Sequence, residues 1–194
     1  MPSTVSAEAQ QWLKSLTQKK SKSQTLAERR AATDRWRAED SAEARKLFPV
    51  NVEEKTIAGV RADIITPASF PEENRSRVLI NLHGGGFNSD SGSLIEGIPI
   101  ASLAKLKVVS VYYRLAPENP FPAAVMDAVA CYRALRAEAG ASTPIVIAGD
   151  SAGGGLALAT PSSYWDYDSL LRIWLSKDSG NGSPAALTML DEPR

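Results

Sequence analysis

The stretch that most constrains the fold is residues 149–153, with the sequence Gly-Asp-Ser-Ala-Gly. It follows a short apolar run at residues 144–148 that is typical of a buried strand, and it precedes residues 156–159, which favour a helix. A serine in such a sharp turn has a strained backbone, and glycines on either side let the strand and the helix approach each other. The pattern indicates a nucleophile elbow with Ser151 as the candidate nucleophile, and an ordinary strand-to-helix turn is the alternative.

The composition indicates one globular domain with no strong charge preference. The 194 residues are 43% hydrophobic and 23% charged, which suffices for a sizeable core. Twenty-two basic residues balance twenty-two acidic ones, so no net field directs the chain to nucleic acid or to an anionic membrane. No run is long enough to span a bilayer, and residues 1–20 lack the apolar segment of a signal peptide.

Cys131 is the only cysteine of the chain. No internal disulfide can form, so a cytoplasmic location is expected. Because no histidine lies nearby in the sequence, a buried apolar role is expected for Cys131 rather than a nucleophilic one.

The order of the predicted elements favours an α/β fold. Two N-terminal helices are predicted over residues 6–16 and 25–48, followed by a hairpin of strands over residues 50–57 and 60–65. Strands at residues 77–82, 107–113 and 144–148 then alternate with helices at residues 94–106, 123–139 and from 152 onward. This alternation predicts a mostly parallel sheet flanked by helices, with ligands bound at the carboxyl ends of its strands.

The charges of the second helix are expected to form a salt-bridged, solvated surface rather than a binding patch. They are Arg29, Arg30, Arg35, Arg37, Glu39, Asp40 and Glu43.

A glycine run at residues 83–86, His-Gly-Gly-Gly, follows one of the buried strands. Acyl transfer needs amide donors for the oxyanion of its tetrahedral intermediate, and amides can approach a substrate closely where side chains are absent. Gly85 and Gly86 fit this need, together with the free N–H of Ala152 at the start of a helix. A flexible loop or a phosphate cradle is the alternative, although the G-x-G-x-x-G spacing is not met. His83 is expected to anchor the loop and not to serve as the general base.

Three segments, in this order, resemble the hormone-sensitive-lipase-like family of α/β-hydrolases. They are His-Gly-Gly-Gly-Phe at residues 83–87, Tyr-Tyr-Arg-Leu-Ala-Pro-Glu-Asn-Pro-Phe-Pro-Ala-Ala at residues 112–124 and Gly-Asp-Ser-Ala-Gly-Gly at residues 149–154. That family contains carboxylesterases and lipases that act mostly on short acyl esters. The resemblance implies a helical cap segment over residues 1–48, the first part of the hydrolase core over residues 49–160 and a divergent tail over residues 161–194 with one possible strand.

The resemblance also implies roles for single residues. Ser151 is the implied nucleophile for a small-molecule ester, and no metal or organic cofactor is implied. The implied oxyanion hole consists of Gly85, Gly86 and Ala152. Support of the loop and of the elbow is implied for His83, Gly84, Gly149, Asp150 and Gly153. A mainly structural role is implied for Tyr113, Arg114, Glu118 and Asp127.

The base and the acid of the family's triad have no match in this chain. The triad runs serine, acid, histidine in chain order, but no histidine follows Ser151, and His83 is the only one. Four aspartates do follow, none of them in a segment that resembles the family's acid motif: Asp166, Asp168, Asp178 and Asp191. A serine without an imidazole is a weak nucleophile, so the activity of this chain is expected to be slight or absent. A non-catalytic protein that binds a small molecule, as the gibberellin receptors of this wider family do, is the alternative. A fragment completed by a second chain is a third hypothesis.

The resemblance ends abruptly after residue 160. Residues 161–168 break the elbow helix, residues 170–175 are expected to start a short new helix, and residues 183–190 again resemble a strand of the family. We interpret the chain as truncated or frame-altered, with residues 161–183 replaced. The strand near residues 185–190 is then expected at an exposed edge of the sheet, where copies of the chain could self-associate.

Overall fold

The structure is a computed structural model that describes residues 4–18, 24–140, 143–162, 171–175 and 187–191. The chain divides into two compact units, residues 1–32 and residues 33–194. Within the described residues, no helix is both long enough and apolar enough to cross a membrane.

Both N-terminal helices begin at the caps that the sequence predicts. In α1 (Ala7–Gln18), the Ser6 hydroxyl accepts a hydrogen bond of 3.2 Å from the Ala9 amide. In α2 (Leu26–Leu47), Thr25 and Glu28 form a reciprocal capping box: the Thr25 amide donates to Glu28 Oε2 at 2.7 Å, and the Glu28 amide donates to Thr25 Oγ1 at 3.2 Å.

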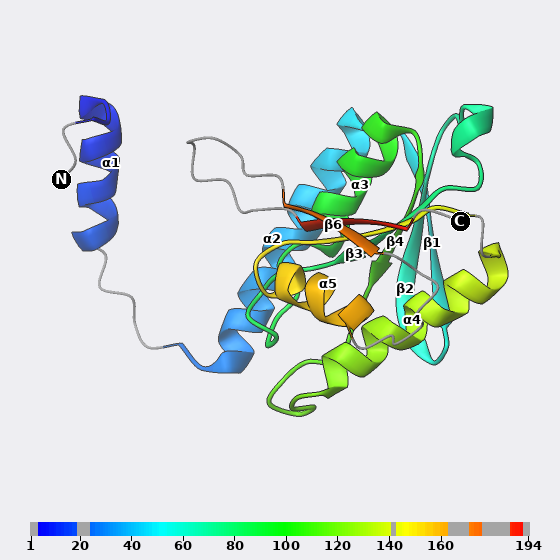
Figure 1. The fold of residues 1–194 in the computed structure, drawn as a ribbon. Coiled ribbons are helices and arrows are strands. Elements are labelled where there is room, and N and C mark those ends of the chain that lie inside the picture. Colours follow the sequence, from blue (N-terminus) through cyan, green and yellow to red (C-terminus); the bar gives the residue numbers. More distant parts are fainter. Residues whose placement is uncertain (1–3, 19–23, 141–142, 163–170, 176–186, 192–194) are drawn as a thin grey trace. The chain divides into compact units, whose positions relative to one another are not determined.

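The second unit holds a sheet in the order β1-β2-β4-β3-β5-β7-β6 (Figure 1). Its strands are β1 (Val50–Ile57), β2 (Val60–Pro67), β3 (Val78–Leu82), β4 (Lys107–Val111), β5 (Ile145–Gly149), β6 (Leu171–Leu175) and β7 (Leu187–Asp191). The three central strands β4, β3 and β5 are parallel, as predicted. The flanking pairs are antiparallel, so the sheet as a whole is mixed.

Helices cover both faces of the central strands. They are α3 (Ser93–Ala104), α4 (Ala123–Ala139) and α5 (Ala152–Ser162), and a short 3-10 helix spans Glu72–Asn74. Along β3, Ile80 and Leu82 join the core under α4 and α5, whereas Leu79 joins the core under α3. Alternate side chains of a strand point to opposite faces, so a strand buried on both faces reads as a continuous apolar run. Gly97 lets α3 lie close to the sheet, since a Cβ there would come within 2.7 Å of Ser110 Oγ.

The tail differs from what the sequence predicted. Residues 170–175 were expected to begin a helix, but Leu171–Leu175 is strand β6, so this prediction is wrong. Five residues rich in branched and aromatic side chains fit a pleated strand, and so short a segment carries too little periodicity to separate the two structures. The predicted strand near residues 185–190 is β7, but it lies between β5 and β6, and the edge strand is β6.

Candidate active site

The elbow is the short turn between β5, which ends at Gly149, and α5, which begins at Ala152. Ser151 has a φ of 50°, in the left-handed region that side chains other than glycine rarely adopt. The residue is exposed at the carboxyl end of a central parallel strand. A strained backbone that presents an exposed hydroxyl is the geometry that a nucleophile elbow requires.

Two glycines of the elbow have no room for a side chain. A Cβ on Gly153 would lie 1.8 Å from the Leu82 carbonyl oxygen and 2.6 Å from that of His83. A Cβ on Gly149 would lie 2.3 Å from the Gly153 carbonyl oxygen. The start of α5 therefore packs directly on the end of β3. This contact brings the elbow and the glycine loop that follows β3 to the same edge of the sheet.

The glycine loop turns through consecutive left-handed residues. The φ angles are 107° at Gly85, 63° at Gly86 and 61° at Phe87. The Gly85 carbonyl accepts hydrogen bonds from the Ser89 amide at 3.2 Å and from the Ser89 hydroxyl at 3.1 Å. The Phe87 carbonyl accepts one of 2.8 Å from the Ala116 amide, which ties the loop to the segment after β4. The assignment of Gly85, Gly86 and Ala152 as an oxyanion hole stays a prediction.

His83 lies beneath the loop and is almost completely buried, with 1% of its surface exposed. Its Nδ1–H donates to the Gly84 carbonyl at 2.7 Å, because a carbonyl can only accept. The ring stacks on Tyr113 at 4.1 Å between centroids, and the Tyr113 hydroxyl donates to the His83 carbonyl at 2.5 Å. Burial lowers the pKa of His83, although the Asp90 carboxylate and the Gly84 carbonyl act in the opposite direction. A neutral imidazole held in this way can support the loop.

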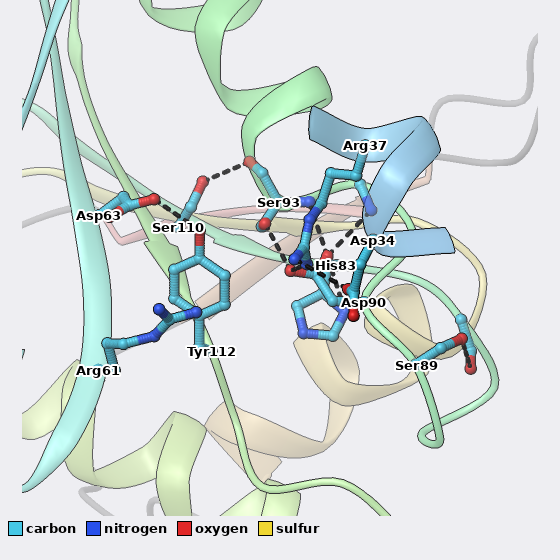
Figure 2. A network of polar contacts seen from close by, with 12 residues as sticks. Asp34, Arg37, Arg61, Asp63, His83, Ser89, Asp90, Ser93, Ser110 and Tyr112 are labelled. Atoms are coloured by element: carbon cyan, nitrogen blue, oxygen red, sulfur yellow. Dashed lines mark hydrogen bonds and ion pairs between the residues drawn. The ribbon is translucent and has the colours of Figure 1, made fainter. Parts of the chain in front are cut away.

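Asp90 is the centre of a buried polar network behind the loop (Figure 2). Its Oδ1 accepts from the amides of Gly92 at 3.1 Å and Ser93 at 3.0 Å, and its Oδ2 accepts from the Ser93 hydroxyl at 2.6 Å. Arg37 donates to the same Oδ2, and His83 Nδ1 lies 3.6 Å from Oδ1. Burial alone would raise the pKa of Asp90, but the charge of His83, the Ser93 hydrogen bonds and the charge of Arg37 hold it below its usual value.

The sequence did not single out this network. Arg37 was expected on a salt-bridged, solvated surface; it does form ion pairs, but its side chain is only 19% exposed. Nothing in the local sequence of this charged helix distinguishes Arg37 from the other arginines or indicates a partner 53 residues away. Asp90 could have been found, because an aspartate two residues before a glycine in a turn often accepts that residue's amide in an Asx turn.

A second acidic group lies beside the elbow. Glu96 of α3 has a pKa raised to about 7, mainly by burial and also by the charges of Asp150 and Asp90, while a hydrogen bond with Asn81 opposes the shift. The Asp150 carboxylate lies against the glycine loop, since a Cβ on Gly84 would come within 2.9 Å of its Oδ2. Its Oδ1 is buried and has no hydrogen-bond partner among the described residues.

A cavity of about 520 Å³ borders the glycine loop at Gly86. Its walls are mostly apolar and include Phe87, Phe121, Val125 and Leu156. At its rim, Arg114 is held by Asp127 through contacts of 2.7–3.0 Å.

Cys131 is buried in the core under α4 and α5, and burial raises the pKa of its thiol to about 12, so it does not act as a nucleophile at neutral pH.

No triad is assembled around Ser151 by the described residues. The only imidazole of the chain is that of His83, which is engaged with Gly84. Asp166, Asp168 and Asp178 lie outside the described residues, and Asp191 is the last residue of β7. In the described part of the chain, no three or more His, Cys, Asp or Glu side chains are grouped to hold a metal ion.

Comparisons with known proteins agree with this geometry. Residues 79–168 match a family model described as alpha/beta hydrolase fold. An acetyl-hydrolase of Streptomyces hygroscopicus is 42% identical over 118 residues, which cover 60% of this chain and 36% of that relative. An esterase of Acinetobacter venetianus is 32% identical over 120 residues, which cover 59% of this chain and 38% of that relative.

Solved structures lead to the same class. An esterase from the bacterial hormone-sensitive lipase family has a TM-score of 0.58 and 32% identity, covering 73% of this chain and 46% of that one. A hyperthermophilic esterase from the archaeon Pyrobaculum calidifontis has a TM-score of 0.67 and 31% identity, covering 84% and 54%. The fold is that of the α/β-hydrolases. The chain is similar to esterases of the hormone-sensitive lipase family, and it spans well under half the length of these curated relatives.

Proposed function

We propose that the chain carries the nucleophile and the oxyanion hole of a serine carboxylic ester hydrolase. The observation that carries the proposal is the left-handed φ of 50° at the exposed Ser151, between a central strand and a helix. The names of the relatives, esterase and acetyl-hydrolase, support the reaction class. Short acyl esters are the proposed substrates, and the apolar cavity beside Gly86 would receive one side of the ester.

The proposed reaction has two stages, acylation of Ser151 by the ester and hydrolysis of the acyl-serine. The Ser151 oxygen attacks the ester carbonyl carbon, and the amides of Gly85, Gly86 and Ala152 donate to the resulting oxyanion. Collapse of the tetrahedral intermediate expels the alcohol and leaves an acyl-serine, which water then hydrolyses to the acid. The serine proton must leave in the first step, and this is the step for which the chain is poorly equipped.

We propose that the chain alone turns over esters slowly or not at all. His83 is buried, its Nδ1–H is engaged with Gly84, and the sequence holds no second histidine. Water must therefore accept the serine proton, and losing the base of a triad lowers rates by several orders of magnitude.

The test is reaction of the 194-residue chain with p-nitrophenyl acetate and with a fluorophosphonate that labels reactive serines. Labelling at Ser151, lost in Ser151→Ala and kept in the control Ser76→Ala, would support the nucleophile; Ser76 is an exposed serine before β3. Equal labelling of wild type and Ser151→Ala would refute the proposed role. Serine-dependent turnover at the rate of a complete esterase would refute the proposed weakness.

A receptor-like protein that binds a small molecule without hydrolysing it is the second candidate. The burial of His83 favours this candidate, because the only imidazole of the chain is hydrogen-bonded to Gly84 and is not available as a base. Saturable binding of a small ester or acid without acylation of Ser151 would support this candidate. Turnover that depends on Ser151 would exclude it.

Three further expectations accompany the proposal. Residues 1–48 are proposed to be a cap segment. Copies of the chain are proposed to self-associate through an edge of the sheet, which size-exclusion chromatography would test by a concentration-dependent elution volume. A reducing, cytoplasmic location is proposed because Cys131 is single and buried.

A further inference from the structure

Arg37 connects helix α2 with the segment that follows the glycine loop. Figure 2 shows its guanidinium reaching from α2 to Asp90 at the turn before α3. Nη1 pairs with Asp90, and Nη2 lies 3.0 Å from Asp34 Oδ1 on the same helix. The fork is therefore oriented by two carboxylates. None of the three motifs that define the candidate site contains this arginine.

Asp90 needs a permanent positive charge beside it. The side chain is only 7% exposed, and a buried carboxylate is strongly destabilising unless it is paired. His83 cannot supply that charge at neutral pH, because burial lowers the pKa of the imidazole, and the charge of Arg37 lowers it further. Arg37 is thus the permanently charged partner of Asp90. The ionised carboxylate in turn accepts the amides of Gly92 and Ser93.

The polar network around Asp90 contacts the glycine loop at the Gly84 carbonyl. The Gly84 carbonyl accepts from His83 Nδ1–H at 2.7 Å and from the Ser91 amide at 3.5 Å. Asp90 adjoins both donors: it precedes Ser91 in the chain, and its Oδ1 lies 3.6 Å from His83 Nδ1. In a planar trans peptide, the carbonyl of one residue and the amide of the next point in opposite directions. Fixing the Gly84 carbonyl therefore fixes the direction of the Gly85 N–H.

We propose that Arg37 is a positioning residue for the oxyanion hole. By neutralising Asp90 it holds the His83 ring and the 90–93 turn on the Gly84 carbonyl, and this orients the Gly85 N–H. The inference rests on the proposed role of Gly85 as an oxyanion donor. A merely stabilising ion pair would affect only the free energy of unfolding. A positioning role predicts that removing the charge of Arg37 also changes the His83 ring and the reactivity of Ser151.

The single histidine makes the effect directly visible. With ¹⁵N-labelled histidine, the chain gives one set of ring signals, and the hydrogen bond to Gly84 predicts the tautomer with the proton on Nδ1. Arg37→Met removes the charge and keeps most of the apolar stem. It is expected to shift these signals towards those of the protonated ring, because an unpaired Asp90 carboxylate 3.6 Å from Nδ1 favours the imidazolium. Arg37→Lys is expected to retain the wild-type signals. The matched control is Arg35→Met, an exposed arginine of the same helix, and it is expected to change nothing.

Ser151 reactivity is the second readout. Fluorophosphonate labelling is expected to slow about tenfold in Arg37→Met, because a displaced oxyanion donor loses much of its effect, and to recover in Arg37→Lys. Wild-type His83 signals and wild-type labelling in Arg37→Met would overturn the inference. If the wild-type chain does not label at all, the proposed function fails, and the His83 signals alone decide the role of Arg37.

A double variant keeps the test decisive if Arg37→Met does not fold. Asp90→Asn removes the charge that Arg37 neutralises and keeps an oxygen for the amides of Gly92 and Ser93. In Asp90→Asn with Arg37→Met, no buried charge is left unpaired. If Arg37 acts through Asp90, this double variant is expected to show the His83 signals of Asp90→Asn alone. Changes that add independently of Asp90 would overturn the inference.

Discussion

The two faces of the central sheet differ in chemistry. Under α4 and α5 the core is a large apolar cluster that includes Ile147, Tyr132 and Leu156. Under α3 the apolar cluster is smaller, and buried polar side chains lie beside it. There the Ser110 hydroxyl donates to the Ser93 carbonyl at 2.7 Å, and Asn81 donates to the same carbonyl at 3.3 Å.

The difference separates two tasks. The apolar face stabilises the sheet by removing hydrocarbon from water, a contribution that does not depend on protonation. The polar face fixes directions, because each hydrogen bond specifies one orientation of a loop or a helix end. The elbow and the glycine loop lie at the carboxyl ends of the central strands, next to both faces of the sheet. Substitutions on the two faces should therefore differ in size and in their dependence on pH.

The largest effect is expected where α5 meets the end of β3. Gly153→Ala would place a Cβ 1.8 Å from the Leu82 carbonyl oxygen, and relief requires the elbow to move, so a loss of about 3 kcal/mol or more is expected. Gly155→Ala, in the same helix, meets nothing within 4 Å and is expected to stabilise by about 0.5–1 kcal/mol. Urea unfolding of both variants measures the contrast, and equal effects would contradict this packing of the elbow.

A somewhat smaller loss is expected in the apolar core. Ile147 is 1% exposed, so Ile147→Ala should reduce the free energy of unfolding by about 2–4 kcal/mol, and Ile147→Val by about 1 kcal/mol. Both losses should be the same at pH 5 and at pH 8. A loss that changed with pH would show that the two faces are coupled more closely than the packing indicates.

The smallest expected effect is the one that depends on pH. Burial raises the pKa of Glu96 from 4.5 to about 7, so the folded chain binds this proton more tightly than the unfolded chain does. Its contribution to stability is therefore complete below pH 4.5 and is lost as the pH rises to about 7. Between pH 5 and pH 8 the wild type should lose roughly 2 kcal/mol relative to Glu96→Gln.

Chemical unfolding at several pH values measures this difference. The control is Glu73→Gln, which changes an exposed carboxylate in the 3-10 helix. Parallel pH profiles of wild type and Glu96→Gln would exclude a proton bound by Glu96 in the folded chain.

Local signals explain what could be predicted from the sequence. The turn at Ser151 is marked by glycines that sit where a Cβ would clash, and the strands are marked by apolar runs, so the fold from residue 50 to residue 160 was predictable. Arg37 and Asp90 were not identified as partners, because their contact spans 53 residues and neither residue type is unusual in its own segment. Strand β6 was mistaken for a helix, because five residues do not establish a period.

The backbone of Ser151 has a consequence for the stability of the fold as well as for its chemistry. A serine at a φ of 50° carries conformational strain that glycine would not carry, so Ser151→Gly could relax the turn. If Ser151 is the nucleophile, this strain is a cost in stability that the fold carries in order to present the hydroxyl.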